Sequence, residues 1–261
     1  MKKIIVVIFG MLLLIPSGMN VKAAEEQVTD AKLKSDYQEM LKDGTIDNNI
    51  TSKQYIDFYR ESEKMRDKME KEVVDEGDFT VRAYKAGFNF QKGDFLVTNA
   101  TSFKGITGHA AIITGANSVL DAPGYAHPVT KNGKKVSLNT TRQQSISSFL
   151  KMYNKKSYHW IAVWRAKRKD VSLKAAKWAD THYYSSKGTA KQDKFPKYSL
   201  SYGLTSTNKV YCSKLVYQAY YYGSGSLNYV APKAFAQLVD PYTLPHIFMG
   251  KYEPNKVKTY K

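Results

Sequence analysis

The pattern of apolar and charged residues changes near residue 80, and this change divides the chain into two parts that fold in different ways. Residues 25–78 carry 16 acidic and 9 basic side chains, and their apolar residues recur at the spacing of amphipathic helices. From residue 80 onward, 28 basic side chains accompany only 7 acidic ones, and short β-rich runs alternate with turn residues. The sequence therefore predicts an acidic helical segment joined to a strongly basic body that contains a sheet.

The N-terminus has the pattern of a secretory signal peptide. Lys2 and Lys3 precede an apolar run over residues 4–15, and Val21-Lys22-Ala23 supplies the small residues of a cleavage region. The alternative is an uncleaved membrane anchor, but twelve apolar residues are fewer than the roughly 17 to 25 that span a bilayer. The chain has one cysteine, Cys212, so no lipid-modified cysteine can follow the cleavage region. We therefore expect a secreted, extracellular protein that is associated with the cell envelope.

Three segments are expected: a signal peptide at 1–23, an acidic helical segment at 24–80 and a catalytic domain at 81–261. The acidic segment is predicted to form two or three short helices, with Thr51-Ser52 as a helix N-cap. Its stretch from Arg60 to Glu76 mixes charges of both signs, which favours a solvated helix. Two hypotheses remain for this segment. It is either a leader without a role in the chemistry or a unit that docks on the basic body.

The body has the sequence pattern of an α+β domain. Strands are predicted over residues 94–98, 109–114, 118–122 and 158–164, and helices over 172–183 and 211–222, with Gly223 at the end of the second helix and a polar loop between the two. Its size suits a single domain.

Several function classes are excluded by what the sequence lacks. One cysteine cannot form an intramolecular disulfide, and there is no CxxC pair, HExxH stretch, P-loop or GxGxxG fingerprint. Neither a cofactor nor a metal is therefore expected. The formal charge of +17 suits an anionic wall polymer or a membrane surface. Nucleic acid is not expected as a partner, because no nucleic-acid-binding signature accompanies the charge.

Cys212 is the candidate nucleophile. It lies at the start of a predicted helix, where the helix dipole favours a thiolate and free backbone N–H groups can bind a developing oxyanion. Cys212 also begins an apolar stripe with Leu215, Val216 and Ala219, which is typical of a buried structural cysteine. A lone thiol in an exported protein is liable to oxidation, which favours the catalytic interpretation over the structural one.

His109 and Asp121 are the candidate partners of the thiol. His109 opens a predicted strand after a glycine-containing loop and can act as the general base if a polar group orients its second nitrogen. Asp121 lies on the next strand. If the connecting loop has three residues, Thr114 faces Ser118, Ala111 faces Asp121, and Asp121 shares a face with His109. A two-residue loop would place Asp121 on the opposite face.

The residues around these three positions resemble the NlpC-type papain-like cysteine hydrolases. The stretch Tyr211 to Tyr220, with Cys-Ser-Lys-Leu-Val at its centre, resembles the nucleophile helix of that family. Residues 92–97 and 108–113 resemble the strands around its histidine, and 119–124 resembles the strand that completes its triad. Here the cysteine follows the histidine, as in the circularly permuted branch that includes YiiX-like hydrolases and lecithin:retinol acyltransferase-like enzymes. The similarity covers about residues 88–225.

The resemblance implies a permuted papain-like fold in which Cys212, His109 and Asp121 form a catalytic triad. It implies a secreted cysteine hydrolase, an amidase or peptidase that works through a thioester intermediate on cell-wall peptides or related envelope amides. The alternatives are a lipid acyl hydrolase or acyltransferase, and a basic wall-binding module without activity. A monomer is expected. Lys214 and Ala111 depart from the family pattern and are expected to narrow the cleft or to alter the substrate.

Overall fold

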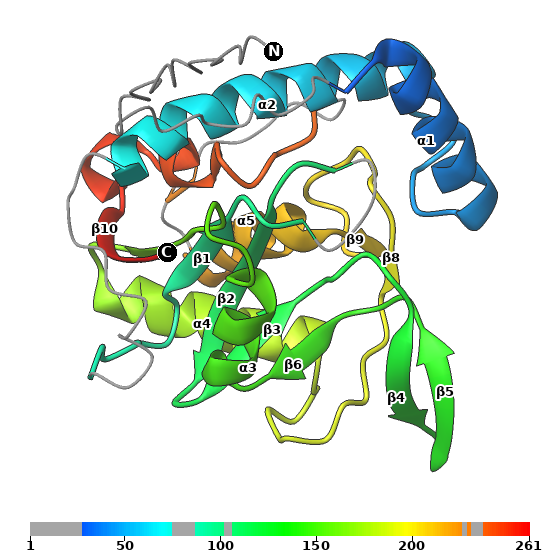
Figure 1. The fold of residues 1–261 in the computed structure, drawn as a ribbon. Coiled ribbons are helices and arrows are strands. Elements are labelled where there is room, and N and C mark those ends of the chain that lie inside the picture. Colours follow the sequence, from blue (N-terminus) through cyan, green and yellow to red (C-terminus); the bar gives the residue numbers. More distant parts are fainter. Residues whose placement is uncertain (1–27, 75–86, 102–105, 226–228, 231–236) are drawn as a thin grey trace, which may run out of the picture.

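The computed structural model describes residues 28–74, 87–101, 106–225, 229–230 and 237–261, so the predicted signal peptide lies outside it. Within these residues, six strands form an antiparallel sheet in the order β10-β7-β1-β2-β3-β6 (Figure 1). The strands are β1 (Phe95–Thr98), β2 (His109–Gly115), β3 (Ser118–Asp121), β6 (Arg142–Gln144), β7 (Ile161–Arg165) and β10 (Asn255–Tyr260). The predicted α+β class is confirmed.

Helices cover both faces of this sheet, because successive side chains of each strand point to opposite sides. Helices α4 (Lys169–Tyr183) and α5 (Cys212–Gly223) pack on one face, and α3 (Ile146–Tyr153) packs on the other (Figure 1). Phe95 belongs to the core on the α5 side, whereas its neighbour Leu96 belongs to the core on the α3 side. At Gly223, an added Cβ atom would lie 2.6 Å from the Ala175 backbone, so α4 and α5 touch closely.

Two small sheets lie outside the main one. Strands β4 (His127–Lys131) and β5 (Lys134–Leu138) form a hairpin that projects from the body, at the lower right of Figure 1. Its turn, Asn132-Gly133, has positive φ at both residues, as a tight two-residue hairpin turn requires. Strands β8 (Lys197–Tyr198) and β9 (Lys209–Val210) pair in parallel.

The strands and helices predicted around the candidate site are confirmed. The structure adds β4, β5, β6, α3, β9 and β10, which the sequence did not predict, and it places the short strand β8 within the predicted polar loop. The described residues also include the short 3-10 helices η2 (Leu244–Ile247) and η3 (Gly250–Tyr252).

The described part of the acidic segment, residues 28–74, contains two helices, α1 (Asp30–Asp43) and α2 (Ser52–Val74). The predicted cap at Thr51 is confirmed, because the Gln54 backbone N–H donates to Thr51 Oγ1 at 3.3 Å. The prediction of a merely solvated helix beyond Arg60 is wrong. Met69 and Val73 are each only 2% exposed and belong to the main core, because they repeat at four-residue spacing on one face of a charged helix. The predicted boundary at residue 80 lies outside the described residues.

This segment lies against the basic body, with α2 running across the top of the molecule in Figure 1. The chain between α1 and α2 pairs with the stretch before α5: the Asp47 backbone N–H donates to the Leu200 carbonyl at 2.8 Å, and Lys209 Nζ donates to an Asp47 carboxylate oxygen at 2.6 Å. Ser62 of α2 hydrogen-bonds Thr107, two residues before His109. The acidic segment therefore docks on the basic body, as the second hypothesis expects, and the contact is largely apolar.

Candidate active site

The start of β2 places His109. Its predecessor Gly108 has φ +69°, and an added Cβ atom would lie 2.8 Å from the Thr98 carbonyl oxygen and 2.5 Å from the Tyr242 hydroxyl. Only glycine fits there, because both the backbone conformation and the space exclude a side chain. His109 then pairs with Thr98 across the β1–β2 ladder and is 2% exposed.

The β2–β3 hairpin places Asp121 on the same face as His109. The expected pairing of Ala111 with Asp121 is confirmed, but the expected pairing of Thr114 with Ser118 is wrong. Gly115 pairs with Ser118 instead, and the register shifts between Ile113 and Gly115. The loop therefore has two residues, and a β-bulge at Thr114 restores the alternation that a short loop would otherwise reverse.

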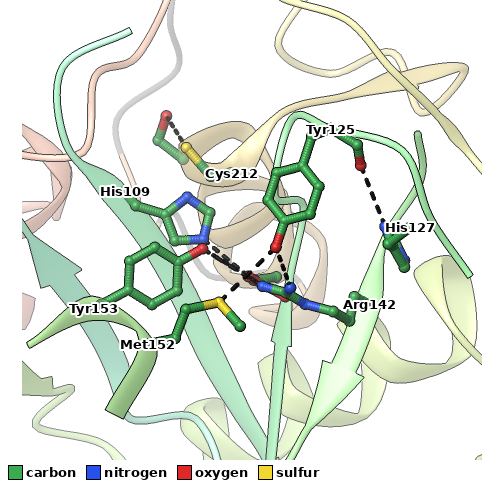
Figure 2. A network of polar contacts seen from close by, with 9 residues as sticks. His109, Tyr125, His127, Arg142, Met152, Tyr153 and Cys212 are labelled. Carbon is green, nitrogen blue, oxygen red and sulfur yellow. Dashed lines mark hydrogen bonds and ion pairs between the residues drawn. The ribbon is translucent and has the colours of Figure 1, made fainter. Parts of the chain in front are cut away.

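Asp121 is the centre of a buried polar network, and its partners His109, Arg142 and Tyr153 are labelled in Figure 2. His109 Nε2 lies 3.0 Å from Asp121 Oδ2. Arg142 on β6 binds both carboxylate oxygens, from Nε at 3.1 Å and from Nη2 at 2.6 Å, and the Tyr153 hydroxyl donates to Oδ2 at 3.3 Å. The Tyr153 ring also stacks on the His109 ring, with 4.7 Å between centroids. The carboxylate is fully buried, and four hydrogen bonds from these three residues hold it in one orientation.

Cys212 approaches the other side of the imidazole. It begins α5, and Figure 2 shows its sulfur beside His109, across the ring from Arg142. The sulfur lies 4.0 Å from the Ser213 hydroxyl oxygen, to which its S–H group can donate, and the influence of the His109 ring and of the Ala110 backbone N–H lowers its pKa. Cys212 is 2% exposed. The three residues predicted from the sequence are thus brought together in the order sulfur, imidazole, carboxylate.

The electrostatics of this trio favour an ion pair between sulfur and imidazole. Burial by itself raises the pKa of Cys212, but the hydrogen bond and the positive charge of His109 outweigh burial and hold that pKa below its ordinary value. Burial lowers the pKa of His109, whereas hydrogen bonds to Asp121 and Cys212 raise it, with a net result of about 9. A thiolate beside an imidazolium is the reactive form of such a pair.

Asp121 stays ionised although it is buried. Burial raises its pKa, but the His109 hydrogen bond and the Arg142 charge lower it below the ordinary value of an aspartate. The carboxylate can therefore orient the ring and stabilise its positive charge through the whole reaction.

The N-terminus of α5 provides a place for a second negative charge. Its N-cap, Tyr211, makes no side-chain capping bond, so the Tyr211 side chain does not occupy the N–H groups of the first turn. These groups, beside the sulfur, can stabilise an oxyanion that forms on a carbonyl under attack. The arrangement can thus form and break a covalent bond between Cys212 and an acyl carbon.

The four other histidines are not part of the trio. His127 contacts the Tyr125 carbonyl, His182 the Trp178 carbonyl and His246 the Glu253 carboxylate, and His159 is partly buried near Lys156. Among the described residues there is no group of three or more histidine, cysteine or acidic side chains that could hold a metal ion. None of the described helices is both long and apolar enough to cross a membrane.

Lys214, the departure from the family pattern two residues after Cys212, is fully buried. Its ammonium donates to the Ser201 hydroxyl at 3.3 Å. Burial lowers its pKa to about 8, assisted by the charge of Lys209 and opposed by that of Asp47. The side chain is thus held where the acidic segment meets the body.

Two site residues were not found by sequence reasoning, Arg142 and Tyr153. The one available signal was electrostatic: a carboxylate buried in a basic body needs a cationic partner. With 28 basic residues in the body, that signal could not indicate which one.

The fold and the site define an α+β protein with a buried cysteine–histidine–aspartate trio suited to covalent acyl chemistry. Residues 68–260 match the family described as LnsA-like lipoprotein N-acylation proteins, and the chain belongs to this family. It is also similar to an uncharacterized 30.3 kDa protein of Bacillus thuringiensis, with 32% identity over 290 residues that cover 100% of both chains. No solved structure matches the chain. The family indicates an acyltransferase type of enzyme, which agrees better with the alternative drawn from the sequence than with the amidase or peptidase.

Proposed function

We propose that the protein is a cysteine acyltransferase that carries an acyl group on Cys212 as a thioester and passes it to an amino group of a lipoprotein. The observation that supports this proposal best is the sulfur–imidazole–carboxylate geometry in a chain whose family is described by lipoprotein N-acylation. Because an N-acylation must end on a nitrogen, the acceptor is an amine.

In the first half-reaction, the Cys212 thiolate attacks the carbonyl carbon of an ester-linked acyl donor. The backbone N–H groups at the start of α5 stabilise the oxyanion. The C–O bond breaks as the oxyanion collapses, and the leaving alkoxide takes the proton of the His109 imidazolium. The products are an acyl thioester on Cys212, a free alcohol and a neutral His109.

In the second half-reaction, the neutral acceptor amine attacks the thioester carbon and gives a proton to His109. The C–S bond breaks, the acyl group leaves as an amide, and the thiolate–imidazolium pair is restored. Asp121 keeps the ring in place during both steps, because Arg142 and Tyr153 fix its carboxylate.

Water in place of the amine would give the hydrolase that the sequence favoured. The deep burial of Cys212 and His109, each 2% exposed, supports transfer over hydrolysis, because a thioester in a dry site reacts with the acceptor that binds beside it. The family description also gives no support to a cell-wall peptide as the substrate.

The proposal extends to the fold and to the place of action. The chain order of His109, Asp121 and Cys212, with the cysteine on a helix against an antiparallel sheet, supports a circularly permuted papain-like fold. The signal-peptide pattern at residues 1–23 supports action on the outer side of the membrane. An acyltransferase placed there has access both to membrane lipids and to exported lipoproteins.

Mass spectrometry of the intact protein tests the first half-reaction. Incubation with phospholipid vesicles should add the mass of one acyl chain, and neutral hydroxylamine should remove it, because hydroxylamine cleaves thioesters. In C212A the adduct should be absent while the fold remains, because the two side chains are close in size. Full acylation of C212A would overturn the mechanism.

The second half-reaction is tested with a lipopeptide that has a free α-amino group. It should discharge the acylated protein and itself gain one acyl chain. The same lipopeptide with an acetylated amine is the matched control, and it should leave the thioester intact. If both peptides leave the thioester to react only with water, the protein is a lipid acyl hydrolase and the proposed transfer is wrong.

A further inference from the structure

A cavity lies beside the network that holds Asp121. It has a volume of about 370 Å³ and is formed by β4, the start of β6 and residues 184–192. Arg142 connects the cavity to the network, since its side chain lines the cavity and also binds both carboxylate oxygens of Asp121. A ligand in the cavity would therefore lie one side chain away from the trio.

The lining of this cavity suits an anion. It includes Lys191, Arg142 and His127, together with neutral side chains, and contains no carboxylate. The Lys191 ammonium has no partner among the described residues. Of the five N–H groups of Arg142, those of Nε and Nη2 donate to Asp121 and Tyr153 and one of Nη1 donates to Tyr125, which leaves one Nη1 hydrogen free.

His127 adds a polar atom that the surrounding described residues leave unsatisfied. The residue is 8% exposed, its Nδ1 lies 3.3 Å from the Tyr125 carbonyl oxygen, and its Nε2 is buried without a hydrogen-bond partner. Because Nδ1 must donate to the carbonyl, the ring can donate from Nε2 only in its positively charged form. An anion in the cavity would stabilise that form and supply the missing acceptor.

The surroundings attract anions from a distance. No aspartate or glutamate occurs between Asp121 and Asp170, whereas that stretch holds eleven lysines and arginines. Three of these lysines, Lys131, Lys134 and Lys135, are exposed on the projecting β4–β5 hairpin, whose first strand forms a wall of the cavity. A cleft with one sign of charge at its mouth concentrates ligands of the opposite sign.

We propose that this cavity binds the phosphate group of a glycerophospholipid and so selects the acyl donor. The proposal rests on the acyl-transfer function above and names the substrate class of the same site. Lys191 and the free N–H of Arg142 bind the phosphate oxygens, the charged form of His127 donates to them from Nε2, and the hairpin lysines face the anionic membrane surface. Glycerol phosphate has the size to enter a cavity of this volume.

Binding is tested without catalysis, on the full chain carrying C212A. Glycerol 3-phosphate should shift the His127 ring signals in NMR spectra toward those of the charged ring, with the signals assigned by comparison with H127Q. K191E should weaken binding by about tenfold or more, the value of one charge-assisted hydrogen bond. K191R should retain binding. K187E is the matched control, because Lys187 is an exposed lysine of the same loop that does not line the cavity, and it should bind like the parent.

The donor is tested by the rate of Cys212 acylation in neutral detergent micelles, with phosphatidylglycerol or with diacylglycerol of the same chains. The parent should prefer phosphatidylglycerol. K191E should lower the ratio of the two rates by about tenfold, and K187E should keep the parent ratio. Equal losses in K191E and K187E would overturn the proposal in favour of general surface charge.

Two further outcomes separate the cavity from the chemistry. If inorganic phosphate shifts His127 but phosphatidylglycerol is not preferred, the cavity serves free phosphate and the lipid assignment is wrong. If neither donor forms a thioester while glycerol 3-phosphate still binds through Lys191, the proposed acyl transfer fails and the phosphate site stands. Absence of any shift at His127 would overturn the site itself.

Discussion

Cys212 and His109 form a charged pair in a place from which water is largely excluded. Desolvation opposes both charges, so neither would persist alone. Each is retained because the other is adjacent and because fixed groups, the Ala110 N–H and the Asp121 carboxylate, complete the hydrogen bonds. The sequence could predict these three residues, since motif order and strand parity are local properties. The apolar stripe that begins at Cys212 indicated burial only as the alternative to a catalytic role, and it could not predict that the sulfur is both buried and beside His109, which is a property of the packed structure.

The first prediction concerns the ionisation of this pair. The pKa of Cys212 is lowered and that of His109 is raised to about 9, so the thiolate should persist to lower pH than in a free cysteine and the imidazolium to higher pH. The ultraviolet absorbance of the thiolate, taken as the difference from C212S, should therefore titrate below the ordinary range of a thiol. H109N should move the midpoint up by about one unit or more. An unchanged midpoint in H109N would show that the two groups do not interact.

Asp121 acts through His109, which gives a second prediction. D121N should lower the turnover number by about 10²- to 10⁴-fold while changing KM little, because the ring loses its orientation and its counter-charge. It should also lower the free energy of unfolding by about 3–5 kcal/mol, since Arg142 would lose its buried partner.

D94N is the matched control for this variant. Asp94 is 1% exposed and binds Arg165 through both oxygens, at 2.8 and 2.7 Å, but is not part of the trio. It should show a similar loss of stability in urea unfolding with an unchanged turnover number. Equal losses of turnover number in D94N and D121N would indicate that D121N lowers turnover through reduced stability and not through the orientation of His109.

At the scale of elements, the β2–β3 hairpin shows both the reach and the limit of sequence reasoning. The alternation of side chains along the strands correctly predicted that Asp121 lies opposite Ala111. The prediction assumed a three-residue loop, however, and the loop has two residues. The bulge at Thr114 is invisible in a pattern of apolar alternation, because it changes the pairing and not the composition. The elements that the sequence did not predict also lack a clear pattern. Strand β6 consists of three polar residues, and α3 and β4–β5 lie in a stretch whose lysines and serines obscure the periodicity of apolar residues.

The third prediction tests how the start of β2 positions the imidazole. G108A should lower the free energy of unfolding by about 1–3 kcal/mol more than G133A does, because the new methyl group meets the Thr98 carbonyl and the Tyr242 ring. Gly133 is the control: it has a similar φ of +76° with no atom near its missing Cβ, so its variant reports backbone strain alone. G108A should also slow acylation of Cys212, and G133A should not. Equal effects of the two variants on unfolding and acylation would contradict this role.

At the scale of the whole molecule, the acidic segment and the basic body share one hydrophobic core. Tyr55 of α2 is fully buried in it, together with Met69 and Val73. The ion pair between Asp47 and Lys209 is partly exposed, and such pairs contribute only about 0–1 kcal/mol. The charge asymmetry that distinguishes this segment in the sequence is thus a minor source of its attachment, and the burial of Tyr55, Met69 and Val73 is the major one.

The last prediction follows from that ranking. A chain that begins at residue 80 loses the burial of Tyr55, Met69 and Val73, each worth about 1.5–3 kcal/mol. For a protein of this size, the loss should lower the melting temperature by about 10–20 °C. The shortened chain should also bind a hydrophobic dye, because the surface under α2 is exposed. Its acylation of Cys212 should change as well, since Ser62 no longer holds Thr107 near His109. In the intact protein, added salt should weaken the contribution of the Asp47–Lys209 pair, and D47N, which lacks this pair, should lose less stability on addition of salt than the parent does. Should the shortened chain keep its melting temperature and its kinetics, the segment would be an independent appendage and the shared core would have no energetic role.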